Sequence, residues 1–271
     1  MIFADNITVK SYAFVRDLLT DPGIRGVHDL RHEVVAVASS TSAQKAADFC
    51  AKVQLPSKAR TYASYAELVA DPDIAIVYVA TPQSHHFQNV TLALEANKHV
   101  LCEKPFTVTA AQARRLVDTA RARKLFLMEA VWTRFFPLST RVRELVSSGA
   151  IGTVYRVIAD SSINRSLPDG KLEYNDSSRV VNPDLAGGTM LELGIYSLTW
   201  IMQILHHPQP KEEKEVPAVT AAMNKYNTGV DETTGFIVQF PRHKAMGIGI
   251  TTMRVGSGVD YDFTGGPAVK I

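Results

Sequence analysis

The run Ile74-Ala75-Ile76-Val77-Tyr78-Val79-Ala80, closed by Thr81-Pro82, decides the fold class of this chain. It is apolar throughout and rich in β-branched residues, which is typical of a parallel strand buried on both faces. A helical pattern follows over residues 84–96, and a second apolar run begins at His99. A strand, a helix and a further strand joined by short turns form a βαβ unit, from which parallel sheets are built.

The same alternation continues on both sides of this unit. Short strands are predicted at 34–38 and 125–128, and helices are predicted at 43–52, 66–70 and 109–123. The hydroxyl residues 39–42 precede the second helix, where such side chains accept hydrogen bonds from the first free amides. Residues 1–130 are therefore predicted to form a doubly wound α/β domain with a mostly parallel sheet.

From about residue 150 the pattern changes to strands that follow one another. Strands are predicted at 153–160, 216–224, 233–240 and 245–253, with one helix at 189–205. Successive strands joined by turns favour an antiparallel sheet. Residues 131–271 are therefore predicted to form a second, α+β domain built on an open antiparallel sheet.

Composition excludes several classes of protein. A chain of 271 residues with 46% hydrophobic and 21% charged residues is expected to be soluble, globular and cytoplasmic, because no apolar run could span a membrane and the N-terminus does not resemble a signal peptide. A net charge of +2 does not favour nucleic-acid binding. The only two cysteines, Cys50 and Cys102, lie far apart in apolar stretches, so we expect reduced thiols in the core instead of a disulfide. His206-His207 lacks a second ligand pair, so a loop is favoured over a zinc site.

Two charged residues occupy an unusual position in His99-Val-Leu-Cys-Glu-Lys-Pro105, because Glu103 and Lys104 directly follow an apolar, strand-like run. Open α/β sheets bind ligands at the carboxyl ends of their strands, so a cation there can act on a cofactor or a substrate oxygen. Lys104 is therefore a candidate active-site residue. The alternative is a solvated Glu-Lys pair in a loop, which would contribute little energy.

Three motifs in order carry a family resemblance: Ala80-Thr-Pro-Gln-Ser-His-His86, Glu103-Lys-Pro105 and Gly187-Gly-Thr-Met-Leu-Glu-Leu-Gly-Ile-Tyr196. Their order and spacing resemble the Gfo/Idh/MocA oxidoreductases. Ala130-Val-Trp-Thr-Arg-Phe-Phe-Pro137 looks most like the branch of dimeric dihydrodiol dehydrogenases and fungal NADP-dependent D-xylose dehydrogenases. The resemblance runs from about Phe14 to the end. It implies a Rossmann-like domain, a second domain with an open antiparallel sheet that forms a homodimer, and a nicotinamide cofactor.

Tyr196 is the candidate acid/base. Glu192 and Tyr196 are four residues apart on the predicted helix and so share one face. A tyrosine near an ammonium group has its pKa lowered from about 10 towards neutral pH, so it can take a proton from a substrate hydroxyl. The alternative from the residues alone is a buried aromatic side chain with a satisfied hydroxyl. The resemblance implies that Tyr196 is the general acid/base, that Lys104 is its partner and that Glu192, where the family commonly has aspartate, faces substrate.

The cofactor is expected to be NADP rather than NAD. An NAD site usually places an acid after the second strand, whereas Ser39 and Ser40 would not repel a 2′-phosphate; the alternative is that this cluster is only a helix cap. Ligand contacts are also expected from other motif residues, and each has a purely structural alternative. Thr81-Pro82 could simply end a strand, the histidines could lie in solvent, Trp132 could be a core residue and Arg134 a surface residue. These expected cofactor contacts are Thr81, Pro82, His85, Glu103, Lys104, Trp132 and Arg134.

Two departures from the family concern the ends. The family's chain opens with a strand and a Gly-rich turn that cradles pyrophosphate, but here the first glycine is Gly23, so both are predicted to be lost. The chain also stops at Ile271, soon after Gly265-Gly266-Pro267, where further strands are expected. An altered gene model, a splice form or a fragment would explain both ends.

The sequence predicts an NADP-dependent dehydrogenase acting on CH-OH groups. Its substrate would be an aldose such as D-xylose, giving a lactone, or a trans-dihydrodiol. The alternative, motivated by the missing glycine turn, is a non-catalytic or truncated family member that binds a partner or a nucleotide without turnover. No metal, nucleic acid or membrane is expected to take part.

Overall fold

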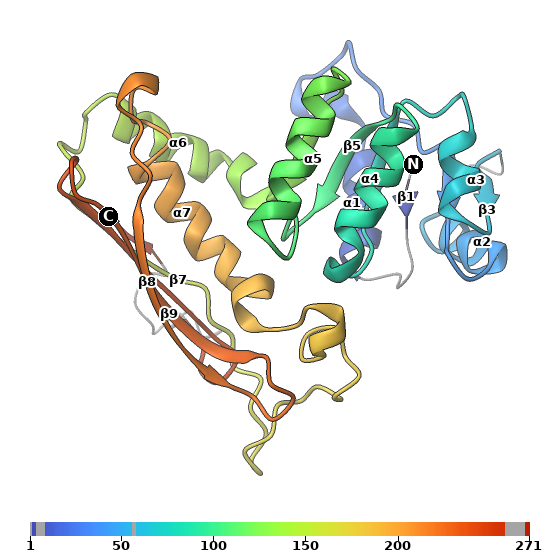
Figure 1. The fold of residues 1–271 in the computed structure, drawn as a ribbon. Helices are drawn as coiled ribbons and strands as arrows, with labels where there is room; N and C mark the ends of the chain where they lie inside the picture. The colour runs from blue at the N-terminus through green and yellow to red at the C-terminus, as the bar shows by residue number, and fades with distance from the viewer. Residues whose placement is uncertain (1, 4–8, 56–57, 258–268) are drawn as a thin grey trace. The chain divides into compact units, whose positions relative to one another are not determined.

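The computed structural model describes residues 2–3, 9–55, 58–257 and 269–271. The chain divides into two compact units, Met1–Ala130 (unit 1) and Val131–Ile271 (unit 2). Figure 1 shows the path of the chain through both units. Among the described helices, none is long and apolar enough to cross a membrane. The segment Gly265-Gly266-Pro267, after which the sequence predicts that the chain stops short of further strands, lies outside the described residues.

Unit 1 is built on a six-stranded sheet in the order β3-β2-β1-β4-β5-β6. Every pairing between neighbouring strands is parallel. This is the strand order of a doubly wound Rossmann fold, in which ligands bind beyond the carboxyl ends of the strands where the order reverses, here between β1 and β4. The strands are β1 (Ile2–Phe3), β2 (Ala36–Ala38), β3 (Arg60–Tyr62), β4 (Ile76–Val79), β5 (His99–Glu103) and β6 (Leu127–Ala130).

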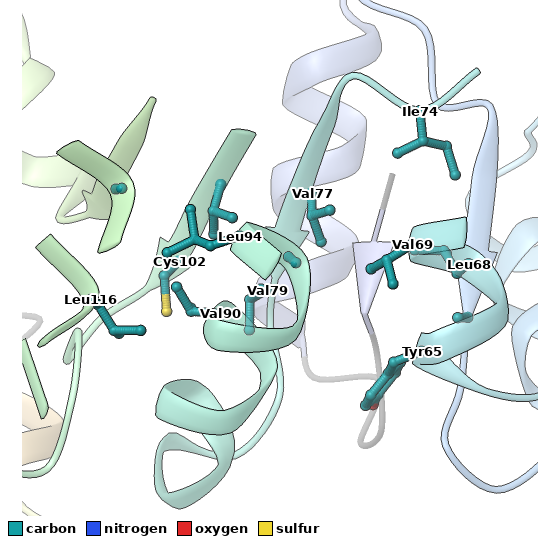
Figure 2. Packing of buried hydrophobic residues seen from close by; sticks show 14 of the residues in the cluster. Tyr65, Leu68, Val69, Ile74, Val77, Val79, Val90, Leu94, Cys102 and Leu116 are labelled. Carbon is teal, nitrogen blue, oxygen red and sulfur yellow. The ribbon is translucent and has the colours of Figure 1, made fainter. Parts of the chain in front are cut away.

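Helices cover both faces of this sheet. Successive side chains of β4 point to opposite faces and are apolar on both, so both faces must be covered. Val77 and Val79 pack with buried residues of α3, α4 and α5 on one face, and Figure 2 draws this cluster around Leu68, Leu94 and Leu116. Tyr78 belongs to the opposite face, with residues of α1 and α2. The helices are α1 (Val9–Leu19), α2 (Ala43–Lys52), α3 (Tyr65–Ala70), α4 (His86–Glu95) and α5 (Ala110–Ala122), with short 3₁₀ turns at η1 (Pro22–Arg25) and η2 (Gln83–His85).

Hydroxyl caps fix where three of these helices begin. Ser42 accepts a hydrogen bond from the Gln44 amide at the start of α2, and Ser64 caps α3 in the same way. Thr109 and Gln112 form a reciprocal capping box at α5. Each cap satisfies an amide that the helix itself leaves without an acceptor, so the predicted helix starts are confirmed to within one or two residues.

A polar cluster holds the turn between α3 and β4. Tyr62 donates a hydrogen bond to Asp71 at 2.8 Å, Arg60 pairs with the same carboxylate at 2.8 Å, and buried Lys98 donates to the Asp71 carbonyl. Burial of Asp71 opposes ionisation, but the hydrogen bonds from Tyr62 and the Asp73 amide, with the charge of Arg60, lower the pKa of Asp71 below its ordinary value. Asp71 therefore stabilises this turn in its ionised form.

Unit 2 is built on a five-stranded sheet in the order β11-β7-β10-β9-β8. The predicted antiparallel sheet is wrong in one pairing: β7 and β10 are parallel, so the sheet is mixed. The connection between them is long and contains α7 (Ile195–Leu205), which allows a parallel return that a hairpin cannot make. The strands are β7 (Arg156–Asp160), β8 (Ala218–Lys225), β9 (Asp231–Phe240), β10 (Ala245–Thr252) and β11 (Val269–Lys270).

One face of this sheet is covered by α7. Buried Ile201 and Ile204 of α7 pack with Val157 of β7 and Phe236 of β9. Gly247 of β10 is required by this approach, because a Cβ there would lie 2.2 Å from the Ile201 side chain. The remaining elements are η3 (Trp132–Phe135), α6 (Pro137–Ser147), η4 (Pro183–Leu185), the π-helical turn η5 (Met190–Gly194), α7 (Ile195–Leu205) and η6 (Lys211–Glu213).

Two further predictions need correction. The first strand is not lost, because Ile2–Phe3 pairs in parallel with both β2 and β4 at the centre of the sheet. The residues that follow it, 4–8, lie outside the described residues, so the prediction of a lost Gly-rich turn stays a prediction. The helix predicted at 189–205 begins with a π-helical turn instead of a regular one.

Candidate functional site

Two of the predicted motifs meet at the carboxyl edge of the unit 1 sheet. Thr81-Pro82 follows β4, and Lys104 follows β5, its parallel neighbour. The Lys104 side chain is 4% exposed, so it is not a solvated loop lysine. Its place at the carboxyl edge of the sheet, where such folds bind ligands, favours a role for Lys104 there.

Glu103 is held by its own unit. Its two carboxylate oxygens accept hydrogen bonds from the Tyr78 hydroxyl at 2.6 Å and from the Lys104 amide at 3.1 Å. Burial, reinforced by the negative charge of Glu103, raises the pKa of Tyr78, so the hydroxyl keeps its proton and acts as a donor. The ring of Phe14 stacks on Tyr78 at 4.0 Å between centroids. These contacts orient Glu103 and the Lys104 backbone; the predicted cofactor contact of Glu103 stays a prediction.

His86, rather than its neighbour, joins the two motif segments. The His86 ring is 1% exposed and its nitrogens lie 2.9 Å from the Thr81 carbonyl oxygen and 2.8 Å from that of Pro105. Burial lowers the pKa of His86 and favours the neutral ring, although two acceptor oxygens would suit a protonated one. The half-buried His85 instead contacts the Ser84 hydroxyl at 2.9 Å. The sequence predicted a cofactor contact for His85, and this stays a prediction; the buried histidine that connects the two motif segments is His86.

The other predicted cofactor contacts of unit 1 differ in accessibility. Thr81 and Pro82 are buried, and the Thr81 hydroxyl accepts a hydrogen bond from Asn89. Ser39 is 1% exposed and bonds within its own turn to Thr41, whereas Ser40 is exposed directly after β2. Ser40 is therefore better placed than Ser39 to meet a ligand beyond β2.

Trp132 and Tyr196 come together in unit 2. The Trp132 indole N–H donates a hydrogen bond to the Tyr196 hydroxyl oxygen at 2.9 Å, although the residues are far apart in sequence. Phe136 supports the indole edge-on at 5.0 Å. A donor directed at the phenolic oxygen favours negative charge there, which is the state a general base requires. Lys104 belongs to unit 1 and Tyr196 to unit 2, and their pairing stays a prediction.

Glu192 forms an ion pair that the sequence did not predict. Arg179 donates to both carboxylate oxygens of Glu192, at 2.8 and 3.1 Å. Glu192 lies in the π-helical turn, four residues before Tyr196, and such turns are frequent at functional sites. Arg134 is exposed in η3, and its carbonyl accepts a hydrogen bond from Arg143. The sequence held only an indirect indication of the Arg179–Glu192 ion pair. Gly187-Gly188 is typical of a place where two segments approach closely, and Arg179 lies on the segment just before these glycines.

Two alternative kinds of site receive no support. Among the described residues, no group of three or more His, Cys, Asp or Glu side chains could hold a metal ion. Cys102 is buried, which raises the pKa of its thiol and makes it unreactive, and Cys50 is a free thiol as well.

A cavity of about 640 Å³ lies beside α1 and residues 27–32, and none of the predicted site residues lines it.

Comparisons with known proteins agree with the motifs. The family model "Oxidoreductase family, NAD-binding Rossmann fold" matches residues 21–131, and the model "GFO/IDH/MocA C-terminal domain" matches residues 139–265. D-xylose 1-dehydrogenase (NADP(+)) of Hypocrea jecorina is 60% identical over 95% of this chain, and trans-1,2-dihydrobenzene-1,2-diol dehydrogenase of Macaca fascicularis is 37% identical over 78% of it. The chain spans 66% and 57% of the lengths of these two relatives.

Solved structures support the fold. A levoglucosan dehydrogenase in complex with NADH and levoglucosan matches 94% of this chain and 66% of its own, with a TM-score of 0.78 and 18% identity. An aldose-aldose oxidoreductase of Caulobacter crescentus matches 95% of this chain and 72% of its own, with a TM-score of 0.73 and 24% identity. With both domain models matched in order and a relative that is 60% identical over 95% of this chain, the chain belongs to the Gfo/Idh/MocA oxidoreductase family.

Proposed function

We propose that this chain is an NADP-dependent dehydrogenase that oxidises an aldose resembling D-xylose to a lactone, or a trans-dihydrodiol. The observation that carries the proposal is the 60% identity to an NADP-dependent D-xylose 1-dehydrogenase. The buried Lys104 and the Trp132–Tyr196 hydrogen bond support it from the chain's own geometry. Unit 1 is proposed to bind the dinucleotide, and unit 2 to bind substrate and form the dimer.

In the proposed reaction Tyr196 takes the proton of the substrate hydroxyl. The Trp132 N–H stabilises the phenolate that accepts this proton, and Lys104 supplies positive charge at the reacting oxygen. A bound nicotinamide would accept the hydride that leaves the same carbon. For an aldopyranose, loss of the anomeric hydrogen and of the hydroxyl proton leaves a carbonyl at that carbon, which is the lactone.

The residues of unit 1 fit a dinucleotide at the switch point between β1 and β4. Buried Thr81-Pro82 closes β4 at this edge, and no acidic side chain stands at residues 39–42 to repel a 2′-phosphate. Ser40 is proposed to face the adenosine ribose, and the rest of the cofactor site is proposed to be lined by Thr81, Pro82, His85, Glu103 and Lys104 of unit 1. Trp132 and Arg134 of unit 2 are proposed as further cofactor contacts.

A homodimer is proposed through the face of the unit 2 sheet opposite α7. Ile158, Ile248 and Ile237 are register partners across β7, β10 and β9, so they lie side by side on this face. Ile237 and Ile250 are 36% and 38% exposed. A row of accessible isoleucines favours association, because covering it removes apolar area from water. A cytoplasmic location is proposed as well, and the free thiols of Cys50 and Cys102 support it.

The proposal is tested by titrating purified protein with NADPH and NADH by fluorescence, and by following NADP⁺ reduction with D-xylose and with a trans-dihydrodiol. Turnover should fall at least 100-fold in Lys104→Met and Tyr196→Phe, an estimate for the loss of acid/base catalysis. Exposed lysine and tyrosine give matched controls within the same units: Lys45→Met and Tyr155→Phe should leave turnover unchanged.

The outcomes separate the two candidate functions. NADPH binding with turnover that depends on Tyr196 supports the dehydrogenase. NADPH binding without turnover of either substrate supports the non-catalytic family member. Absence of NADPH binding would refute both the cofactor and the reaction, and it would agree with the lack of glycine before Gly23.

A further inference from the structure

We propose that Tyr78 is a positioning residue for the dehydrogenase reaction, because its hydroxyl fixes the Glu103 carboxylate and this carboxylate in turn holds the backbone of Lys104. The inference rests on the proposed function, in which Lys104 supplies positive charge at the reacting oxygen. Tyr78 lies outside every motif of the family resemblance, so it adds to that function a residue that the motifs do not contain.

The register of two parallel strands brings Tyr78 to Glu103. Tyr78 of β4 stands opposite Leu101 of β5. Because successive side chains of a strand alternate between faces, Glu103 lies on the same face as Leu101, two residues further along β5. Leu101 packs against the cluster that contains Tyr78, in agreement with this placement. The tyrosine reaches diagonally along the sheet, and its hydroxyl donates to Glu103 Oε1 at 2.6 Å.

Tyr78 is itself held in place and remains a donor. Its side chain is buried, and the Phe14 ring stacks on it with 4.0 Å between centroids and 25° between planes. Burial raises the pKa of Tyr78, so the hydroxyl keeps its proton at neutral pH. Glu103 Oε2 accepts from the Lys104 amide at 3.1 Å. Two donors, one on each oxygen, therefore fix the carboxylate plane and the peptide at which Lys104 begins.

Side chains of two other elements hold the backbone that follows Lys104. The Pro105 carbonyl oxygen lies 2.8 Å from Nδ1 of His86, which begins α4. The Phe106 amide donates to Oε1 of Glu129 on β6 at 2.8 Å. The segment is thus anchored on both sides of Lys104, and removal of the tyrosine hydroxyl would loosen the anchor that precedes it.

The experiment compares Tyr78→Phe with Tyr62→Phe. Tyr62 donates to the Asp71 carboxylate at 2.8 Å in the turn before β4, so the control deletes the same kind of hydrogen bond elsewhere in unit 1. In NADP⁺ reduction with D-xylose, kcat should fall about tenfold in Tyr78→Phe, the effect of losing a hydrogen bond to a charged group. Its KM for D-xylose should change less than about threefold, because charge at the reacting oxygen acts mainly in the transition state. Tyr62→Phe should keep both constants within about twofold of wild type.

A Lys104→Met background separates positioning from packing. Without an ammonium group to position, Tyr78→Phe should lower kcat by less than about twofold further. An equal fall in both backgrounds would overturn the inference, since a packing defect or a smaller folded fraction acts in both. An unchanged kcat in Tyr78→Phe alone would overturn it as well. If Tyr78→Phe does not fold, Glu103→Gln replaces it in the same comparison, because a single amide oxygen cannot take the place of both carboxylate oxygens.

Hydrogen exchange of the Lys104 amide decides the inference separately from catalysis. If wild-type protein turns over no substrate, the proposed function fails, but this amide can still be followed by NMR in protein labelled with ¹⁵N-lysine. Its exchange should be about tenfold faster in Tyr78→Phe than in wild type, and unchanged in Tyr62→Phe. Equal exchange in Tyr78→Phe and wild type would refute the positioning of Lys104 by Tyr78.

Discussion

Exchange of Trp132 for phenylalanine tests whether the indole N–H supports the reaction. The variant keeps an aromatic ring beside Phe136 but removes the donor that lies 2.9 Å from the Tyr196 oxygen. A hydrogen bond to a charged oxygen contributes about 1.5–3 kcal/mol when shielded, but Trp132 is 57% exposed and water can replace part of it. We therefore expect a cost of roughly 1 kcal/mol, or about a fivefold fall in kcat/KM at neutral pH.

The assay is steady-state oxidation of D-xylose between pH 6 and 10. Because the lost donor favours the phenolate, the activity of Trp132→Phe should recover as the pH rises, and its profile should move to higher pH than that of wild type. In a Tyr196→Phe background the indole has no oxygen to bind, so Trp132→Phe should have little further effect. An equal loss in both backgrounds would refute the reasoning, since it would mean that Trp132 acts through packing alone.

Three further predictions concern stability and assembly. Gly188→Ala should lower the free energy of unfolding by about 2 kcal/mol or more, measured by urea denaturation, because its Cβ would lie 2.1 Å from Asp231 Oδ1 at a φ of +119°; unchanged stability would contradict it. Because the folded state lowers the pKa of Asp71, the ionised carboxylate stabilises the fold above its ordinary pKa near 4, and this stabilisation is lost as the pH falls through the pKa of the folded state. The Tm of wild type should therefore fall more steeply below about pH 4 than the Tm of Asp71→Asn. Parallel curves of Tm against pH would contradict this prediction. Ile237→Asp should convert the proposed dimer to a monomer in sedimentation velocity, with Val219→Asp on β8 as an exposed control, and loss of the dimer in both would argue against the open face.

Much of unit 1 could be predicted because its signals are local. The apolar run ending at Thr81 forms a strand, and the hydroxyls at Ser42 and Thr109 begin helices, since each depends on residues within one turn. The two-residue strand Ile2–Phe3 could not be predicted, because a segment that short carries no periodicity and is fixed only by pairing with β2 and β4. The same limit applies to the parallel pairing of β7 and β10, which depends on the path of the intervening chain.

The candidate site divides in the same way. The sequence by itself determined which residues are chemically suitable: Lys104 at a strand end, and Glu192 and Tyr196 four residues apart. Only the tertiary structure decided that Lys104 is buried, that Trp132 donates to Tyr196 and that Arg179 clamps Glu192. The physical reason is that residue type and spacing act over one turn of chain, whereas burial and hydrogen bonding depend on which distant segments pack together, and that packing is set by the whole sheet and its glycine contacts.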